Sequence, residues 1–233
     1  MTKVKETKEE IVIPVVTDQE SVYVDPLDRA EFLFRSNMKL LGYITAGIFA
    51  IGAVVAGYMY WQSEQNGEAQ KELFHAVYQF ESDSLKQALN GNGNHWGLLR
   101  VADEFSGTDA ANQAEFYIGA AFLKQGKFKE AVEHLNKFKS SDALVQARAY
   151  CLLGDANLEL NQADEAISFY RKAAEHKPNK QFTPGYLMKL ALAQTVAKDT
   201  KGASETYSKV VEEYPESAEL SEAKRLKVYY SGE

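Results

Sequence analysis

The pattern of apolar positions divides the chain at one uninterrupted stretch, residues 40–61, which contains no charged side chain. At a rise of about 1.5 Å per residue it forms a helix of roughly 33 Å, enough to cross a hydrocarbon core of about 30 Å. Lys39 precedes the stretch and Trp61 ends it, and such residues fix the depth of a spanning helix. Because the stretch is apolar on all sides, we expect a transmembrane helix rather than a buried helix of a soluble core.

The flanks of this span indicate an uncleaved signal anchor. Thirty-nine residues precede it, far more than the short basic leader of a signal peptide, and no small-residue cleavage pattern follows it. Residues 22–39 hold three Lys or Arg, whereas residues 62–79 hold only Lys71. Positively charged flanks tend to stay in the cytoplasm, so we expect a cytoplasmic N-terminus and a translocated C-terminal part.

The segment before the span, residues 1–39, is predicted to be a largely disordered cytoplasmic tail. It opens with a run of charged residues, and its short apolar island at residues 11–16 is interrupted by Pro14. Pro26 is placed to begin a short juxtamembrane helix, apolar on one side, that would lean on the lipid headgroups.

Small residues recur at helical spacing within the span. At steps of three or four they form one stripe: Gly42, Ala46, Ala50, Ala53 and Gly57. In lipid, close packing of small-residue faces is a main source of helix association, so this stripe is a candidate contact for a partner helix. The alternative is that Gly and Ala are simply common in membrane helices.

Beyond the span the pattern changes to that of amphipathic helices. A helix is expected over residues 68–90, then a loop rich in Asn and Gly, then a short helix at residues 96–105. The loop lacks the preceding strand and the glycine spacing of a nucleotide-binding loop, so we interpret it as a turn. Together these segments predict a degenerate first helix pair over residues 67–106.

Three segments that resemble one another follow, at about residues 112–145, 147–180 and 184–216. The matching positions are Gly119, Gly154 and Ala191 on the first helices, Ala131, Ala166 and Ala203 on the second helices, and then Pro178 and Pro215. The three alanines are spaced 35 and 37 residues apart, near the period of about 34 of the tetratricopeptide repeat. Small residues let two helices cross closely, and proline ends the second helix.

These patterns predict an all-α fold. One N-terminal transmembrane helix precedes a right-handed helical solenoid of about three tetratricopeptide-type repeats. Each repeat leaves an apolar face for its neighbour, so the array needs caps. The degenerate first pair supplies one cap, and an amphipathic helix over residues 217–230 supplies the other.

Composition and charge narrow the function by exclusion. The net charge of −7 disfavours nucleic acid as a partner. The single cysteine, Cys151, cannot form an internal disulfide and lies in an apolar helix pattern, so we interpret it as a small core residue. The four histidines lie on separate segments without metal-ligand spacing. We therefore expect no catalytic residues, cofactor, metal or small-molecule substrate.

The concave face of such an array is lined by the first helix of each repeat. By register it presents Gln113, Phe116, Ala120, Leu123, Lys124, Arg148, Cys151, Asp155, Leu158, Glu159, Met188, Leu192, Thr195 and Val196. The mixture is largely apolar and lacks a Lys/Asn/Arg cluster for a C-terminal carboxylate, so a helix or an extended apolar segment is the expected ligand. The alternative is that the chain's own caps cover part of this face.

Several features carry a family resemblance: the short tail, the single anchor, the Asn-Gly loop at residues 90–94, the run Glu104-Phe105-Ser106-Gly107-Thr108 and about three repeats. From about Leu40 to its end the chain resembles the single-pass tetratricopeptide proteins of the bacterial inner membrane, a family that includes the ancillary subunit of the Sec translocon. The resemblance implies that residues 62–233 form a periplasmic scaffold near the translocon, in contact with envelope chaperones or newly exported chains.

Two functions from different classes follow as hypotheses. The first is a membrane-anchored interaction scaffold for protein export or envelope quality control. The second is a structural subunit that bridges fixed partners of an envelope assembly without binding clients. An exposed apolar groove favours the first, and a groove filled by the chain's own helix favours the second.

Overall fold

The computed structural model describes residues 37–231, and the regular secondary structure in this part of the chain is helical. The predicted tail helix at Pro26 and the other residues of 1–36 lie outside the described residues. The chain divides into two compact units, Met1–Ala56 and Gly57–Glu233. Helix α2 (Met38–Glu81) begins in the first unit and ends in the second.

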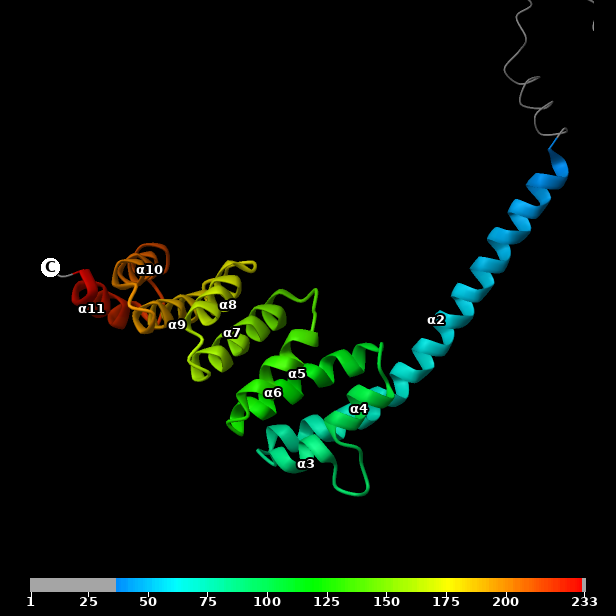
Figure 1. Ribbon diagram of the computed structural model, residues 1–233, viewed down its shortest axis with the longest axis horizontal. Helices are drawn as coiled ribbons and strands as arrows, with labels where there is room; N and C mark the ends of the chain where they lie inside the picture. Colours follow the sequence, from blue (N-terminus) through cyan, green and yellow to red (C-terminus); the bar gives the residue numbers. More distant parts are fainter. Residues whose placement is uncertain (1–36, 232–233) are drawn as a thin grey trace, which may run out of the picture. The chain divides into compact units, whose positions relative to one another are not determined.

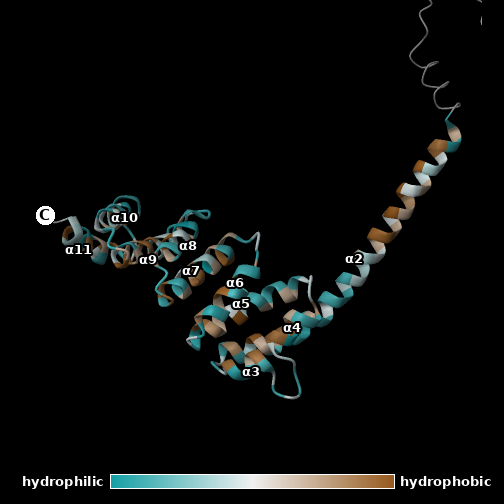
Figure 2. Cartoon of the chain, viewed as in Figure 1, coloured by the Kyte–Doolittle hydropathy of each residue, from teal (hydrophilic) through white to brown (hydrophobic). Residues whose placement is uncertain are grey.

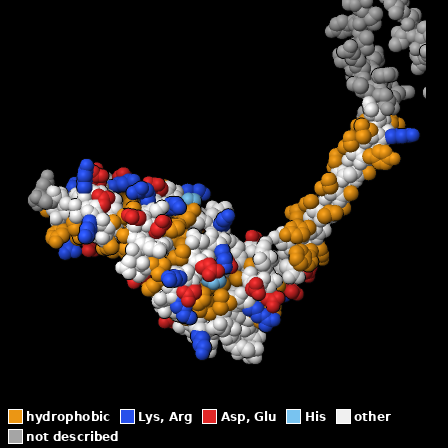
Figure 3. Space-filling model, in the orientation of Figure 1, with side chains coloured by type: hydrophobic (Ala, Val, Ile, Leu, Met, Phe, Trp, Pro, Cys, Tyr) orange, Lys and Arg blue, Asp and Glu red, His pale blue; other side chains and the backbone are white. Residues whose placement is uncertain are grey.

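In the first unit, α2 presents apolar side chains on all sides. Ile48, Phe49 and Val54 are 64%, 80% and 72% exposed. Hydrophobic residues mark this part of the helix, brown in Figure 2 and orange in Figure 3. Within residues 37–231, α2 is the one helix that is long and apolar enough to cross a membrane by length and composition. The structure thus agrees with the sequence on an apolar helix at the predicted span.

The second unit is a stack of helix pairs that follow one another in chain order (Figure 1). Its helices after α2 are α3 (Leu85–Asn90), α4 (Leu98–Glu104), α5 (Asp109–Lys124), α6 (Phe128–Lys137), α7 (Ala143–Glu159), α8 (Ala163–Glu175), α9 (Thr183–Val196), α10 (Thr200–Glu213) and α11 (Leu220–Ser231). From α3 on, each helix packs against the next along the chain. This arrangement confirms the predicted all-α fold class.

The turns within the three repeats share one backbone conformation. Gly126, Asn161 and Lys198 adopt positive φ angles of 73°, 59° and 65° just after the first helix of each repeat. A left-handed residue at this point ends a helix and reverses the chain, so α6, α8 and α10 fold back onto α5, α7 and α9. The three pairs are therefore built on one register.

Small residues lie where the two helices of a repeat cross. The predicted alanines on the second helices are fully buried: Ala131, Ala166 and Ala203. A Cβ added to Gly119 would meet Leu135, and a Cβ added to Gly154 would lie 2.6 Å from Tyr170 Cδ1. Leu135 and Tyr170 each follow the buried alanine of their repeat by one helical turn. The same close contact therefore recurs in two successive repeats.

The first helix pair differs from its predicted form. The helix expected over residues 68–90 is the continuation of α2, which ends at Glu81, and α3 begins as a separate helix. At the break, Asp83 has a φ of 57° and the Ser82 hydroxyl donates to the Tyr78 carbonyl at 2.8 Å. Short polar side chains of this kind compete with the helical backbone for hydrogen bonds, which explains the interruption.

Helix α11 lies where the capping helix is expected. Its Ala223 is fully buried, and its Tyr230 ring stacks on Tyr207 of α10 with centroids 6.1 Å apart. The remaining surface of α11 is mostly polar, as a helix at the end of a repeat array requires.

Candidate functional site

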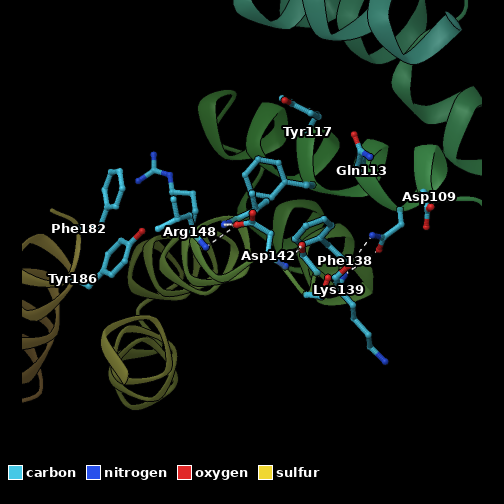
Figure 4. A pocket seen from close by; sticks show the side chains of 15 residues that line it. Asp109, Gln113, Tyr117, Phe138, Lys139, Asp142, Arg148, Phe182 and Tyr186 are labelled. Atoms are coloured by element: carbon cyan, nitrogen blue, oxygen red, sulfur yellow. Dashed lines mark hydrogen bonds between the residues drawn. The ribbon is translucent and has the colours of Figure 1, made fainter. Parts of the chain in front are cut away.

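A pocket of about 790 Å³ opens in the second unit between the N-terminal parts of α5, α7 and α9 and the linker between α6 and α7. Its volume falls in the range of about 300–1,000 Å³ that is typical of ligand pockets. The apolar part of its wall consists of Phe116, Tyr117, Phe138, Leu144, Val145, Phe182 and Tyr186, several of which Figure 4 labels. The pocket forms because the first helices of successive repeats present their N-terminal ends to the same region.

Apolar side chains are exposed at this pocket to an extent that is rare elsewhere in the repeats. Leu144, Val145 and Phe182 are 49%, 38% and 45% exposed. Within residues 85–213, the other large hydrophobic side chains with such exposure are Leu192 and Val196. Exposed apolar side chains gathered around a concavity are a common feature of interaction surfaces, whereas isolated ones need no explanation.

The linker that walls the pocket is held in place by side-chain hydrogen bonds. The Asn112 amide pairs with the Lys139 peptide, donating to its carbonyl at 2.7 Å and accepting from its N–H at 3.0 Å. The Ser140 N–H donates to Gln146 Oε1 at 2.7 Å, and Gln146 is buried. These polar groups are therefore engaged within the wall and define a fixed edge of the pocket.

Asp142 sets the direction in which α7 enters the pocket wall. Its carboxylate accepts the N–H groups of Leu144 at 2.8 Å and Val145 at 3.0 Å, as an N-cap does. These hydrogen bonds lower the pKa of the Asp142 carboxyl below its ordinary value, and the bond from Val145 has the largest effect. The cap holds the first turn of α7 with Leu144 and Val145 at the pocket.

Aromatic rings form one side of the pocket. Phe116 and Phe138 lie 5.2 Å apart between centroids, and Tyr117 meets Phe80 edge to face at 5.4 Å. Burial, and then the charge of Glu81, raise the pKa of Tyr117, so its hydroxyl stays protonated at neutral pH. The aromatic wall therefore adds apolar surface and no charge.

Three of the residues predicted on the concave face meet in this pocket: Gln113, Phe116 and Arg148. They lie toward the N-terminal ends of α5 and α7. The others lie outside it: Ala120, Leu123, Lys124, Cys151, Asp155, Leu158, Glu159, Met188, Leu192, Thr195 and Val196. Partner binding by any of them remains a prediction.

Ion pairs occupy part of the predicted face beyond the pocket. Lys124 Nζ lies 2.9 Å from an Asp83 carboxylate oxygen. The Asp155 carboxylate accepts from the Tyr170 hydroxyl and from Lys189 Nζ, both at 2.6 Å. Burial, and then the bond to Asp155, raise the pKa of Tyr170. Asp155 thus joins both helices of the second repeat to the first helix of the third.

Cys151 lies fully buried beneath the concave face. The pKa of its thiol is raised to about 11, chiefly by burial, so the thiol is protonated at neutral pH. A buried protonated thiol is a poor nucleophile, which agrees with the interpretation of Cys151 as a core residue.

The small-residue stripe of the span is open in the first unit and at Gly57. An added Cβ would meet nothing within 4 Å at Gly42 or Gly57, and Ala46, Ala50 and Ala53 are exposed. The stripe is therefore accessible to a second helix, and contact through it remains a prediction.

Sequence reasoning missed several lining residues, chiefly Phe138, Leu144, Val145 and Phe182. Leu144, Val145 and Phe182 lie at the starts of α7 and α9, where the repeat register assigns no face. Phe138 ends the second helix of the first repeat, and its register position was expected in the core. The sequence feature that could have indicated them is the presence of apolar residues beside helix-capping residues, such as Leu144 and Val145 after Asp142.

Within residues 37–231 the structure shows no group of three His, Cys, Asp or Glu side chains arranged to hold a metal ion.

Comparison with known protein families identifies the helix pairs. Two family models, each described as tetratricopeptide repeat, match residues 118–181 and residues 186–217. The matches cover most of the stretch from α5 to α10. No curated protein matches the chain. The chain therefore contains tetratricopeptide repeats, an architecture that serves as a scaffold for protein–protein interaction, while the repeat itself does not specify a partner.

Proposed function

We propose that this protein is a membrane-anchored scaffold that binds a segment of another protein in the pocket between α5, α7 and α9. The observation that carries the proposal is the gathering of Leu144, Val145 and Phe182, all well exposed, around one fixed concavity of the repeat array. An apolar ligand segment would remove these side chains from water, at roughly 25 cal/mol per Å² of apolar surface buried.

The proposed location is the periplasmic side of a bacterial inner membrane. This location is supported by the apolar helix α2, by the excess of Lys and Arg before the span and by the family resemblance. On this proposal the partners are the Sec translocon, periplasmic chaperones or exported chains, and no cofactor is involved. The alternative, a bridging subunit without clients, predicts one constant partner at the pocket in place of varied exported chains.

Photocrosslinking from the pocket in intact cells tests this function. A photoreactive amino acid at Val145, which is partly exposed in the pocket, is expected to capture protein partners that mass spectrometry identifies. The matched control is Glu165 on α8, an exposed residue that does not line the pocket. Varied exported proteins captured at Val145 alone support client binding, and one fixed protein supports the bridging alternative. Equal capture at both positions rejects the pocket as the binding site.

The orientation of the anchor is a separate prediction. Residues after the span are expected outside the cytoplasm, because residues 22–39 hold three Lys or Arg against one in residues 62–79. Protease added to spheroplasts should digest the repeats and leave the N-terminal segment protected. Repeats that resist digestion until the membrane is permeabilised would reverse the orientation and remove the periplasmic assignment.

A further inference from the structure

The polar groups of the pocket differ in whether they are free to bind a ligand. Asn112 pairs with the Lys139 peptide, and the Asp142 carboxylate caps α7. Gln146 and Ser140 hold the linker. These groups have their hydrogen bonds within the wall, so they define its shape and contribute little to recognition.

Arg148 is the strongest exception. It is exposed on the second turn of α7, and its guanidinium forms no ion pair within residues 37–231, although it interacts with the Cys151 sulfur one turn further on. Figure 4 shows it near the end of the pocket that Phe182 and Tyr186 form, with Asp109 at the opposite end. A guanidinium has five N–H donors in a planar fork. Most of those donors are thus available to a ligand, beside apolar side chains that exclude water.

The chemistry of this end of the pocket selects a carboxylate. Arg binds a carboxylate through two parallel hydrogen bonds, and such charge-assisted bonds are about twice as strong as neutral ones. An apolar segment lying on Leu144, Val145 and Phe182 would lower the local dielectric and strengthen the pair. The two acids of the lining do not supply this partner: the Asp142 carboxylate is bound to α7, and Asp109 lies at the other end.

We propose that the ligand of this pocket is an apolar peptide segment that carries an acidic side chain, and that Arg148 pairs with that side chain. This inference rests on the proposed function of the pocket. A C-terminal main-chain carboxylate is the less suitable source, since its capture uses several converging donors. The lining has two cationic residues, Arg148 and Lys139, and the Lys139 side chain points away from the cavity in Figure 4. Because the chain carries a net charge of −7, long-range attraction does not favour an acidic partner, and the selectivity must arise from contact.

Peptide binding to the full-length protein in detergent tests the inference. The probes are short fluorescent peptides with one apolar sequence and an amidated C-terminus, which differ only in a central Glu, Gln or Lys. By fluorescence anisotropy, the Glu peptide is expected to bind roughly tenfold more tightly than the Gln peptide, the size expected of a charge-assisted bond. In Arg148→Met this difference should vanish, and in Arg148→Glu the Lys peptide should become the tightest. Arg171→Met, which removes an exposed arginine of α8 outside the pocket, should retain the wild-type ratio.

The outcomes separate this inference from the function on which it rests. Equal binding of the Glu and Gln peptides, weakened by Leu144→Asp, overturns the acidic ligand and leaves the pocket as a peptide site. Tight binding of the Gln peptide only when its C-terminus is a free carboxylate also overturns it, in favour of the main-chain source. Failure of all peptides to bind rejects both the ligand and the proposed pocket function. An unchanged Glu preference in Arg148→Met assigns the carboxylate to another residue and overturns the role of Arg148.

Discussion

Leucine in place of Ala166 is expected to destabilise the repeat domain by about 3 kcal/mol, the upper end of typical overpacking effects. Ala166 is fully buried on α8, in a cluster that includes Cys151 and Tyr170. Protein interiors are close-packed, so the three additional carbons force neighbouring side chains or the helix itself to move. Urea denaturation of a fragment that begins near Glu64 measures the change in the free energy of unfolding.

Ala163→Leu is the matched control on the same helix. Ala163 is the first residue of α8 and is only partly buried, because it follows directly on the turn between α7 and α8. A larger side chain there can extend into solvent, and surface substitutions usually change stability by less than about 0.5 kcal/mol. Comparable losses at positions 163 and 166 would show that the repeat register is wrong, and the concave face would then have to be reassigned.

The spacing of small residues was sufficient to predict the repeat register. The spacing did not predict which side chain contacts each small residue. Gly154 and Ala166 are the small residues of the two helices of the second repeat, but the close neighbour of Gly154 is the ring of Tyr170, four residues after Ala166. Side chains of an α-helix point toward its N-terminus and cover the preceding turn, so the tyrosine ring reaches back to the level of Ala166. Positions alone therefore locate the crossing, and side-chain direction decides the contact.

The hydrophobic pattern predicted the apolar part of α2 better than it predicted the length of the helix. Apolar residues give way to an amphipathic pattern after Trp61, and the sequence therefore suggested two segments. A change from an apolar to an amphipathic pattern does not by itself break a helix, and Gly67 alone costs only about 1 kcal/mol in a helix interior. The helix consequently continues to Glu81 and ends at the polar run that contains Asp83.

The pocket could be predicted only in part, because its wall combines elements distant in sequence. Gln113 and Arg148 follow from helical register, whereas Phe182 enters from the turn before α9. Ion pairs also reshape the predicted face, since Lys124 meets Asp83 from the first helix pair. Such contacts depend on how the pairs stack, and periodicity within one helix contains no information about them.

Alanine in place of Gly154 is the second large effect, and its sign is opposite to that expected from helix propensity. Alanine favours a helix interior over glycine by about 1 kcal/mol. At Gly154 the added Cβ would lie 2.6 Å from both Cδ1 and Cε1 of Tyr170. That ring is 2% exposed and its hydroxyl is bound to Asp155, so it cannot move aside without losing a buried contact. We expect a net destabilisation of up to about 2 kcal/mol, since overpacking costs about 1–3 kcal/mol and the helix propensity of alanine offsets about 1 kcal/mol of it.

Gly185→Ala provides the comparison that isolates packing from propensity. Gly185 lies in the first turn of α9, and an added Cβ would meet only Glu219 Oε1, at 3.6 Å, which is an ordinary contact. Here the alanine is expected to stabilise the domain by up to about 1 kcal/mol. Denaturation of both variants under the same conditions should therefore shift the midpoint in opposite directions. Stabilisation by both would mean that α7 and α8 are separated enough to admit a methyl group, and the close crossing on which the repeat register depends would be absent.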